Sequence, residues 1–207
     1  MTVDMGESQQ LHQMRYSLYL YLSRAFARVP DGAFLALAGD ATIAKMCQAF
    51  SVEAVELQEV ISSEMSGGTA EARLTEEFTR LFLSLDNLLV SPWESSYVPT
   101  TTAAAVRETY RSAGYESRGY PHEADDHIAT ELCFMAALAE DSLDACRKGD
   151  ADRLAYLEGI QRGFLAERLN RWVCDFADAV GQVPDISPFF PALARFAALL
   201  CMRDPIL

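Results

Sequence analysis

Histidine and acidic residues are concentrated in one short segment, residues 122–131, of this 207-residue chain. Two of the three histidines, His122 and His127, occur there together with four carboxylates. These carboxylates are Glu123, Asp125, Asp126 and Glu131. Imidazole and carboxylate groups at this density are typical of a metal site, of an acid–base centre, or of acids at the beginning of a helix, where they complement the helix dipole.

A metal site is the least supported of these three interpretations. His127 and Glu131 are four residues apart and would share one face of a helix, as two ligands must. Di-iron carboxylate bundles, however, require two Glu-x-x-His repeats and two further glutamates on facing helices. The chain contains no Glu-x-x-His sequence, and its remaining histidine is the distant His12. We therefore expect no metal and no other cofactor.

An acid–base centre would place Asp126 or Glu131 beside His127, where a carboxylate tunes the imidazole near neutral pH. No serine or cysteine stands in a recognisable nucleophile motif, and no glycine-rich phosphate loop precedes a helix. A metal- or His/Asp-dependent helical hydrolase that uses residues 122–131 remains the alternative function. The third interpretation makes Glu123, Asp125 and Asp126 cap and first-turn acids of the following helix.

The segments that must position this cluster are helical nearly throughout. Apolar residues recur at three- and four-residue spacing, and turn residues interrupt them. The predicted helices span about 11–26, 43–65 (one or two helices), 70–83, 102–113, 123–148, 154–176 and 188–200. Residues 84–102 and 114–122 are predicted loops, and strand-like alternation is absent from the sequence. We expect one all-α domain over residues 1–207, a bundle of roughly seven to ten helices with a possible hinge near 114–122.

Composition narrows the possible partners and the compartment. The net charge of −13 repels nucleic acid and anionic lipid and favours basic partners. The sequence has no apolar run long enough to span a bilayer, and its first ten residues do not resemble a secretory signal. We expect a cytoplasmic protein without stable membrane insertion. The five scattered cysteines, each in an apolar segment, are expected to be buried thiols.

Three segments of the chain resemble one known family. The sequence Glu123-Ala-Asp125-Asp126-His127-Ile-x-x-Glu131-Leu-x-Phe-Met135 is similar to the Glu-Pro-x-Asp-His-(Ile/Leu)-x-x-Glu-Leu-x-(Phe/Tyr)-Met signature of the TorD/DmsD family. These proteins are dedicated cytoplasmic chaperones for molybdenum-cofactor oxidoreductases. The chain has Ala124 where the family usually has proline.

Two further segments carry the same resemblance. The run from Leu81-Phe82 to Ser91-Pro92-Trp93-Glu94-Ser95-Ser96-Tyr97 resembles the family's Leu-Phe … Pro-x-Glu-Ser-x-Tyr loop, without the usual Gly-Pro after Leu-Phe. The run Phe164-Leu165-x-x-Arg168-Leu169-x-x-Trp172-x-x-x-Phe176 resembles a family helix that has histidine at the position of Arg168. The resemblance extends from the first predicted helix to the last.

The resemblance implies an all-helical protein that is not an enzyme. It implies a chaperone that binds the twin-arginine signal peptide, the apo-form of a molybdoenzyme reductase, or both. Such a chaperone aids cofactor insertion and delays export until the client is mature. Monomers and domain-swapped dimers both occur in the family. A helical regulator that binds another basic peptide is a further alternative.

The resemblance also implies where the peptide binds. Carboxylates would contact the arginines, and aromatic faces would contact the apolar part of the signal. His127 would orient the loop carboxylates, and Glu131 would tie the two loops together. The expected peptide-binding residues are Trp93, Glu94, Ser95, Tyr97, Tyr120, Glu123, Asp125, Asp126, His127 and Glu131.

Overall fold

The computed structural model describes residues 5–65, 69–83, 88–117 and 124–207, and within these ranges the chain is all α-helical, as predicted. The helices are α1 (Met5–Ala27), α2 (Gly32–Ala38), α3 (Ala41–Phe50), α4 (Val52–Glu64), α5 (Ala70–Phe78), α6 (Ala103–Ser112), α7 (Ile128–Lys148), α8 (Ala151–Glu167), α9 (Val173–Gly181) and α10 (Phe189–Met202). Short helical turns are η1 (Thr79–Leu83, a π-helix) and the 3₁₀ segments η2 (Glu94–Ser96) and η3 (Leu169–Arg171). None of the described helices is both long and apolar enough to cross a membrane.

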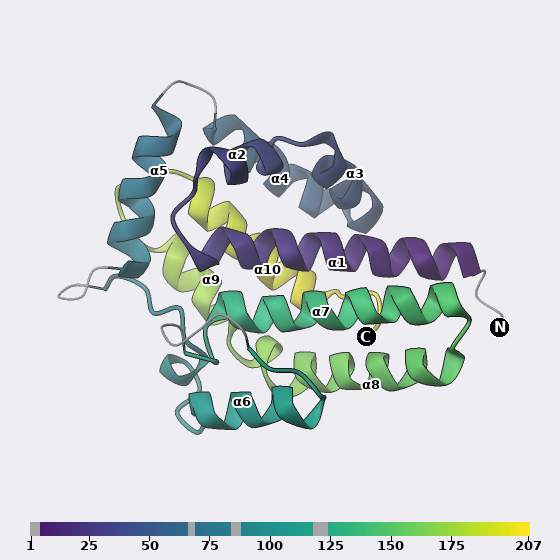
Figure 1. The fold of residues 1–207 in the computed structure, drawn as a ribbon. Coiled ribbons are helices and arrows are strands. Elements are labelled where there is room, and N and C mark those ends of the chain that lie inside the picture. The colour runs from purple at the N-terminus through teal and green to yellow at the C-terminus, as the bar shows by residue number, and fades with distance from the viewer. Residues whose placement is uncertain (1–4, 66–68, 84–87, 118–123) are drawn as a thin grey trace.

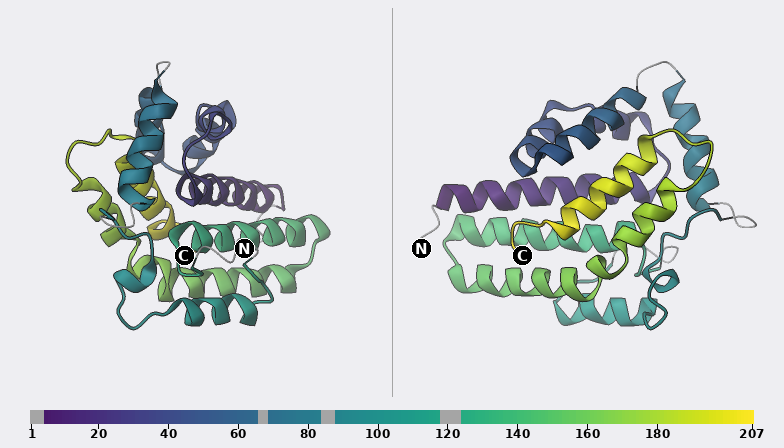
Figure 2. Two further views of the ribbon diagram at one scale, coloured as in Figure 1. Left: turned by 60° about the vertical axis from the view of Figure 1, so that its left-hand side comes forward. Right: turned by 180° about the vertical axis from the view of Figure 1, so that it is seen from behind.

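The two longest helices, α1 and α7, lie side by side in the middle of the molecule (Figure 1). Each buries an apolar stripe, represented by Leu18 and Leu22 on α1 and by Leu132 and Met135 on α7. Helix α8 runs along the other side of α7, and α10 crosses α1 on its far side in Figure 1, so that it lies in front of α1 when the molecule is seen from behind (Figure 2). The N-terminal end of α7 lies close to the loop before α6, which contains Pro92 and Glu94.

Local turn chemistry sets several helix ends. Asp31 caps α2 by accepting a hydrogen bond from the Phe34 amide at 2.7 Å. Thr102 caps α6 in the same way through the Ala105 amide at 3.2 Å, which confirms the predicted start of that helix. Gly149 ends α7 in the left-handed conformation, with φ of 69°, which a residue without a Cβ adopts at little cost.

Helix α7 begins at Ile128, five residues later than the sequence predicted. The N-cap is His127, whose backbone is extended (φ −77°, ψ 138°) and whose Nδ1 accepts the Ala129 amide at 3.1 Å. Asp125 and Asp126 therefore lie in the turn before the helix, and the interpretation of them as first-turn acids was wrong. The helix starts late because the turn residues make contacts outside the helix.

The single helix predicted over 154–176 is in fact two helices joined by η3. The backbone leaves helical values at Arg168 (φ −125°, ψ −92°) and at Trp172 (φ −144°, ψ −19°). The break brings the Trp172 indole against Tyr97 and Glu131. Apolar spacing alone does not reveal this break, because Leu165, Leu169 and Trp172 remain buried on both sides of it.

Two smaller expectations also change. Pro188 stands at the N-cap of α10 rather than at its first helical position. Cys47, Cys146 and Cys201 are buried as predicted, whereas Cys133 and Cys174 are exposed. The predicted hinge near 114–122 falls largely on residues 118–122, outside the described residues, and remains a prediction.

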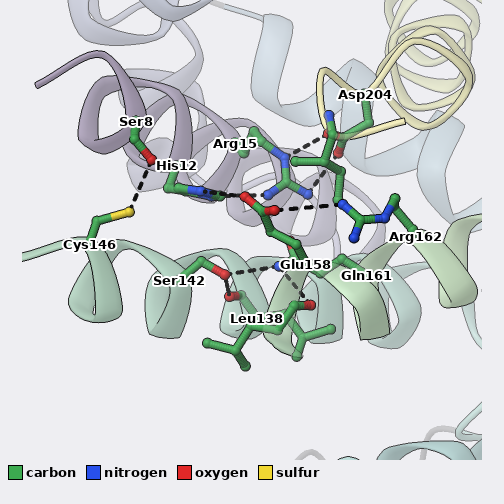
Figure 3. A network of polar contacts seen from close by, with 12 residues as sticks. Ser8, His12, Arg15, Leu138, Ser142, Cys146, Glu158, Gln161, Arg162 and Asp204 are labelled. Atoms are coloured by element: carbon green, nitrogen blue, oxygen red, sulfur yellow. Dashed lines mark hydrogen bonds and ion pairs between the residues drawn. The ribbon is translucent and has the colours of Figure 1, made fainter. Parts of the chain in front are cut away.

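The C-terminal tail is held to α1 by a buried cluster, which we call the C-terminal anchor: Arg15, Tyr19 and Asp204 (Figure 3 shows Arg15 and Asp204). Arg15 donates from Nε to Asp204 Oδ1 at 2.7 Å and from Nη2 to Oδ2 at 3.0 Å. The Tyr19 hydroxyl adds a hydrogen bond to Oδ2 at 2.6 Å. A two-oxygen fork of this kind is among the stronger protein hydrogen-bond geometries, so it fixes the chain after α10 against the middle of α1.

Next to the anchor, His12 lies between Arg15 and Glu158 (Figure 3). Its ring nitrogens are 3.3 Å from Arg15 Nη1 and 3.3 Å from Glu158 Oε1. Burial, and then the neighbouring guanidinium, lower the pKa of His12. His12 thus belongs to the packing of α1 against α8 and is separate from the cluster at 122–131.

Candidate functional site

The two motif loops, far apart in sequence, pair with each other through their backbones. We call residues 91–97 and 124–128 the paired loops. The Glu94 amide donates to the Asp126 carbonyl at 2.8 Å, and the Ile128 amide donates to the Pro92 carbonyl at 2.8 Å. Trp93 and His127 form the isolated bridge between these bonds. The residues that sequence analysis assigned to one surface are therefore brought together by main-chain pairing.

Asp126 serves this pairing with its side chain. Its Oδ2 accepts the Ser95 amide at 3.2 Å, and the residue is only 2% exposed. A carboxylate that accepts a backbone N–H at the start of η2 stabilises the turn in the same way as a helix cap. Asp126 thus holds the first loop, while Ser95 is left exposed on the surface.

Glu94 and Glu131 lie fully buried beneath the paired loops. Glu94 Oε1 accepts the Thr101 hydroxyl at 2.9 Å and is 3.7 Å from the Arg168 guanidinium. Glu131 Oε2 accepts the Trp172 indole N–H at 3.3 Å. Burial, and then the adjacent Glu94 carboxylate, raise the pKa of Glu131 well above its ordinary value.

The neutral form of Glu131 also accounts for two buried oxygens of this pair. Glu94 Oε2 and Glu131 Oε1 are buried and have no other hydrogen-bond partner among the described residues. A protonated Glu131 that donates to Glu94 satisfies both oxygens and avoids burying two like charges. Glu131 on α7 accepts a hydrogen bond from Trp172 and lies next to Glu94 of the first loop, and its role in tying the two loops together remains a prediction.

His127 is a capping residue with a neutral imidazole. Burial lowers its pKa to about 4, although the Asp126 charge acts in the opposite direction. Its Nδ1 accepts the Ala129 amide, and the edge of its ring faces Trp93 with centroids 6.3 Å apart. No group of three or more histidine, cysteine or acidic residues within the described ranges is arranged to hold a metal ion. These contacts give the hydrolase alternative no support.

Asp125 of the paired loops forms an ion pair with a half-exposed arginine, Arg107. Its Oδ2 is 2.6 Å from Arg107 Nη2 and 2.7 Å from Arg107 Nε. The Asp125 side chain is 8% exposed, whereas the Arg107 side chain is 51% exposed. The Tyr110 hydroxyl donates to the Asp125 carbonyl at 2.8 Å and so ties the same turn to α6.

Arg107 was missed by sequence reasoning, although a weak signal existed. Arg107 and Arg111 are four residues apart on α6 and share one face of it, in a chain with a net charge of −13. Two cations on one face of a helix beside an acidic loop suggest an ion pair between them. Which carboxylate would accept it follows only from the packing of α6 against the turn.

A mostly apolar cavity of about 370 Å³ opens beside these loops, between α1, α7 and the end of α6. The lining includes Ala27 from α1, Phe134 and Ala137 from α7, and Tyr110 and Tyr115. Ser23, Thr130, Cys133, Glu116 and Ser117 provide its few polar edges. Sequence reasoning did not find this cavity, because its walls come from three segments that are distant along the chain.

The aromatic residues of the first loop have different roles. The Tyr97 ring stacks on Trp172 with centroids 5.5 Å apart, and its hydroxyl donates to the Ser91 carbonyl at 2.9 Å. Tyr97 therefore shapes the loop from within, whereas Trp93 is half-buried and partly accessible at the surface. The two other expected binding residues, Tyr120 and Glu123, lie outside the described residues.

Comparisons with known proteins identify relatives over most of the chain. The profile of the family described as nitrate reductase delta subunit matches residues 43–178. Chaperone protein TorD from two strains of Vibrio cholerae serotype O1 is 25% identical over 211 residues, which cover 97% of this chain and 94% of each relative. A crystal structure of a putative redox enzyme maturation protein from Archaeoglobus fulgidus superposes with a TM-score of 0.56. It is 21% identical, covers 89% of this chain and 91% of its own, and shows the shared fold.

Proposed function

Since the chain belongs to the nitrate reductase delta subunit family, and within it to the TorD-type redox enzyme maturation chaperones, we propose that it binds the twin-arginine signal peptide of a molybdenum-cofactor oxidoreductase. It binds the apo-form of this client before export. By covering the signal it delays export and leaves time for insertion of the molybdenum cofactor. It acts in the cytoplasm, performs no catalysis itself, and holds no cofactor of its own.

The observation that carries this proposal is the apolar cavity next to the acidic paired loops. A twin-arginine signal presents two cations followed by an apolar segment. The cavity of about 370 Å³ offers apolar walls to that segment, as in the binding of an amphipathic helix in a groove. Asp125 stands at the neighbouring turn, already in contact with one guanidinium. The chain therefore has an apolar receptor and an arginine-binding carboxylate side by side.

The contacts of each residue divide the expected site into two groups. Trp93 and Ser95, which are at least partly exposed, and Asp125, which is buried but paired with the half-exposed Arg107, make up the part that contacts the peptide. Glu94, Asp126, His127, Glu131 and Tyr97 hold these residues in place through the contacts described above. The second group would affect binding only through the positions of the paired loops.

The test is calorimetric titration of the full chain with a synthetic peptide that carries two consecutive arginines and an apolar stretch of about 7–15 residues. A control peptide has both arginines replaced by glutamine, and a second control has its apolar stretch replaced by serines. We expect binding of the first peptide that weakens with each control. The affinity should also fall as salt is raised, because carboxylate–guanidinium contacts are screened. Equal binding of all three peptides, or of none, would refute the proposal.

A further inference from the structure

The position of Arg107 extends the proposed function. In the structure this guanidinium occupies Asp125 through two contacts of 2.6 and 2.7 Å to the single oxygen Oδ2. We propose that Arg107 is a built-in competitor: it takes the place of a peptide arginine on Asp125 and must leave when the signal peptide binds. This inference rests on the proposed function.

Two hollows that share a wall connect Asp125 to the apolar cavity. A smaller hollow of about 130 Å³ is lined by Arg107, Arg111 and Asp125. Four residues line both hollows: Tyr110, Tyr115, Glu116 and Ser117. A peptide whose apolar part lies in the larger cavity therefore has its cationic part next to the smaller one. The occupant is a cationic segment joined to an apolar one, and the acidic charge of the chain, −13, favours it.

The aspartate is held firmly, whereas its arginine is not. The turn that carries Asp125 is fixed by the Tyr110 hydroxyl on its carbonyl, and by the His127 amide on the Ala124 carbonyl at 3.1 Å. These bonds do not involve Arg107. The Arg107 side chain, by contrast, is half exposed. Its release would leave the carboxylate in position for another guanidinium.

Exchange of one guanidinium for another costs little charge desolvation. Replacement of Arg107 by a peptide arginine keeps the Asp125 carboxylate paired with a guanidinium before and after the exchange. Arg107 contacts only one carboxylate oxygen, so an incoming arginine that engages both oxygens makes the stronger, two-oxygen contact. The internal pair then reduces the apparent affinity to its intrinsic value multiplied by the fraction of molecules in which Asp125 is free of Arg107.

The test compares Arg107→Gln with Arg111→Gln in titrations with the twin-arginine peptide. Both variants remove one positive charge from α6, and both residues line the smaller hollow, but only Arg107 contacts Asp125 in the structure. We expect Arg107→Gln to bind the peptide about two- to fivefold more tightly than Arg111→Gln does, as removal of a partly exposed competing ion pair predicts. Equal affinity of the two variants would overturn the inference, and so would weaker binding by Arg107→Gln.

A double-mutant cycle with Asp125→Asn makes the assignment specific. We expect Asp125→Asn alone to weaken peptide binding by about tenfold, the loss expected for a charge-assisted contact. In the Asp125→Asn variant, Arg107→Gln should no longer tighten binding, because the carboxylate for which Arg107 and the peptide arginine compete is absent. Persistence of the gain would show that Arg107 acts on another group and would refute the inference. Arg107→Lys, which keeps the charge without the planar fork, should give a smaller gain than Arg107→Gln.

The outcomes separate this inference from the proposed function. If the unaltered chain fails to distinguish the twin-arginine peptide from its glutamine control, the proposed function fails. If it does distinguish them but Arg107→Gln behaves like Arg111→Gln, only the competitor role of Arg107 fails. Thermal unfolding of each variant identifies any change in affinity that comes from loss of the fold.

Discussion

Arg15–Asp204 and Arg107–Asp125 join the same two residue types at nearly the same distance, 2.7 and 2.6 Å. In the first pair both side chains are fully buried and the guanidinium engages both carboxylate oxygens. In the second pair the arginine is half exposed and engages one oxygen. The first pair closes the C-terminal tail onto α1, and the second lies at a cavity. Burial, rather than distance, separates a permanent tether from an exchangeable contact.

The largest expected effect tests the buried pair. Asp204→Ala leaves the Arg15 cation buried without its partner, so we expect it to destabilise the chain by about 3–5 kcal/mol. Urea unfolding followed by circular dichroism measures this change. The matched control is Glu53→Ala, which breaks the exposed pair of Glu53 with Arg203, also 2.7 Å long. The control should leave the unfolding midpoint nearly unchanged. Similar losses of stability in the two variants would show that burial does not set the strength of these ion pairs.

The next largest effect is the pH dependence of stability that comes from His127, the N-cap of α7. The pKa of His127 is about 4 in the folded chain, and about 6.5 in an unfolded one. The unfolded state therefore takes up the proton first as the pH falls. The contribution of His127 to stability is complete above pH 6.5, and declines by roughly 3 kcal/mol as the pH falls to 4.

A capping residue that does not titrate isolates this contribution. His127→Asn keeps an N-cap acceptor for the Ala129 amide but has no proton to gain. We expect the stability of the unaltered chain to fall more steeply between pH 6.5 and 4 than that of His127→Asn, measured by urea unfolding at each pH. Other titrating groups, including His12, affect both proteins alike. Parallel profiles would mean that the imidazole is not held neutral by burial.

A smaller effect is expected at the buried carboxyl pair. Glu131→Ala leaves the Trp172 indole N–H and Glu94 Oε2 without partners, and should cost about 1–3 kcal/mol. Glu131→Gln resembles the neutral acid, since its amide can donate to Glu94 while its carbonyl accepts from Trp172. It should retain most of the stability at neutral pH in the same unfolding experiment. A loss for Glu131→Gln as large as for Glu131→Ala would argue for an ionised Glu131.

The smallest effect on stability is expected at the exposed pair. Arg107→Gln should cost less than about 1 kcal/mol, because an ion pair with a half-exposed arginine is screened by water. The measurement is urea unfolding, set beside the change in peptide affinity of the same variant. A loss of unfolding free energy close to that of Asp204→Ala would mean that the Arg107–Asp125 pair stabilises the fold as strongly as the Arg15–Asp204 pair does.

Much of the fold could be predicted from the sequence, because helices depend on spacing within a few residues. The periodic apolar positions predict α5, α6 and α10 to within a few residues, and the predicted span 43–65 corresponds to α3 and α4. Helix α1 begins six residues before its predicted start, and α2 was not predicted. The prediction was wrong at the break between α8 and α9, where apolar spacing continues while the backbone turns toward Trp172. It was also wrong at the start of α7, where the acids before His127 bond to the other loop and to α6.

The candidate site could be predicted only in part. The motifs around Trp93 and His127 could be singled out from residue types, and the structure brings them together. Arg107 and the cavity could not be predicted, because each depends on how α6 and α1 pack against the end of α7. The assignment of the carboxylates as peptide contacts remains a prediction.

The sequence by itself determined the helical class and the family, because both depend on local patterns. Apolar residues three and four apart predict the helices, and motifs of fewer than twenty residues identify the family. The acidic composition and the two motif loops also led us to expect a basic partner, which remains a prediction. Only the tertiary structure decided which acids are buried and paired and which are reached from solvent. The charge state and the partner of a carboxylate depend on desolvation and on neighbours that are distant along the chain. Asp204 and Asp125 are both aspartates paired with an arginine, and only the folded chain distinguishes the fully buried pair from the one with a half-exposed arginine.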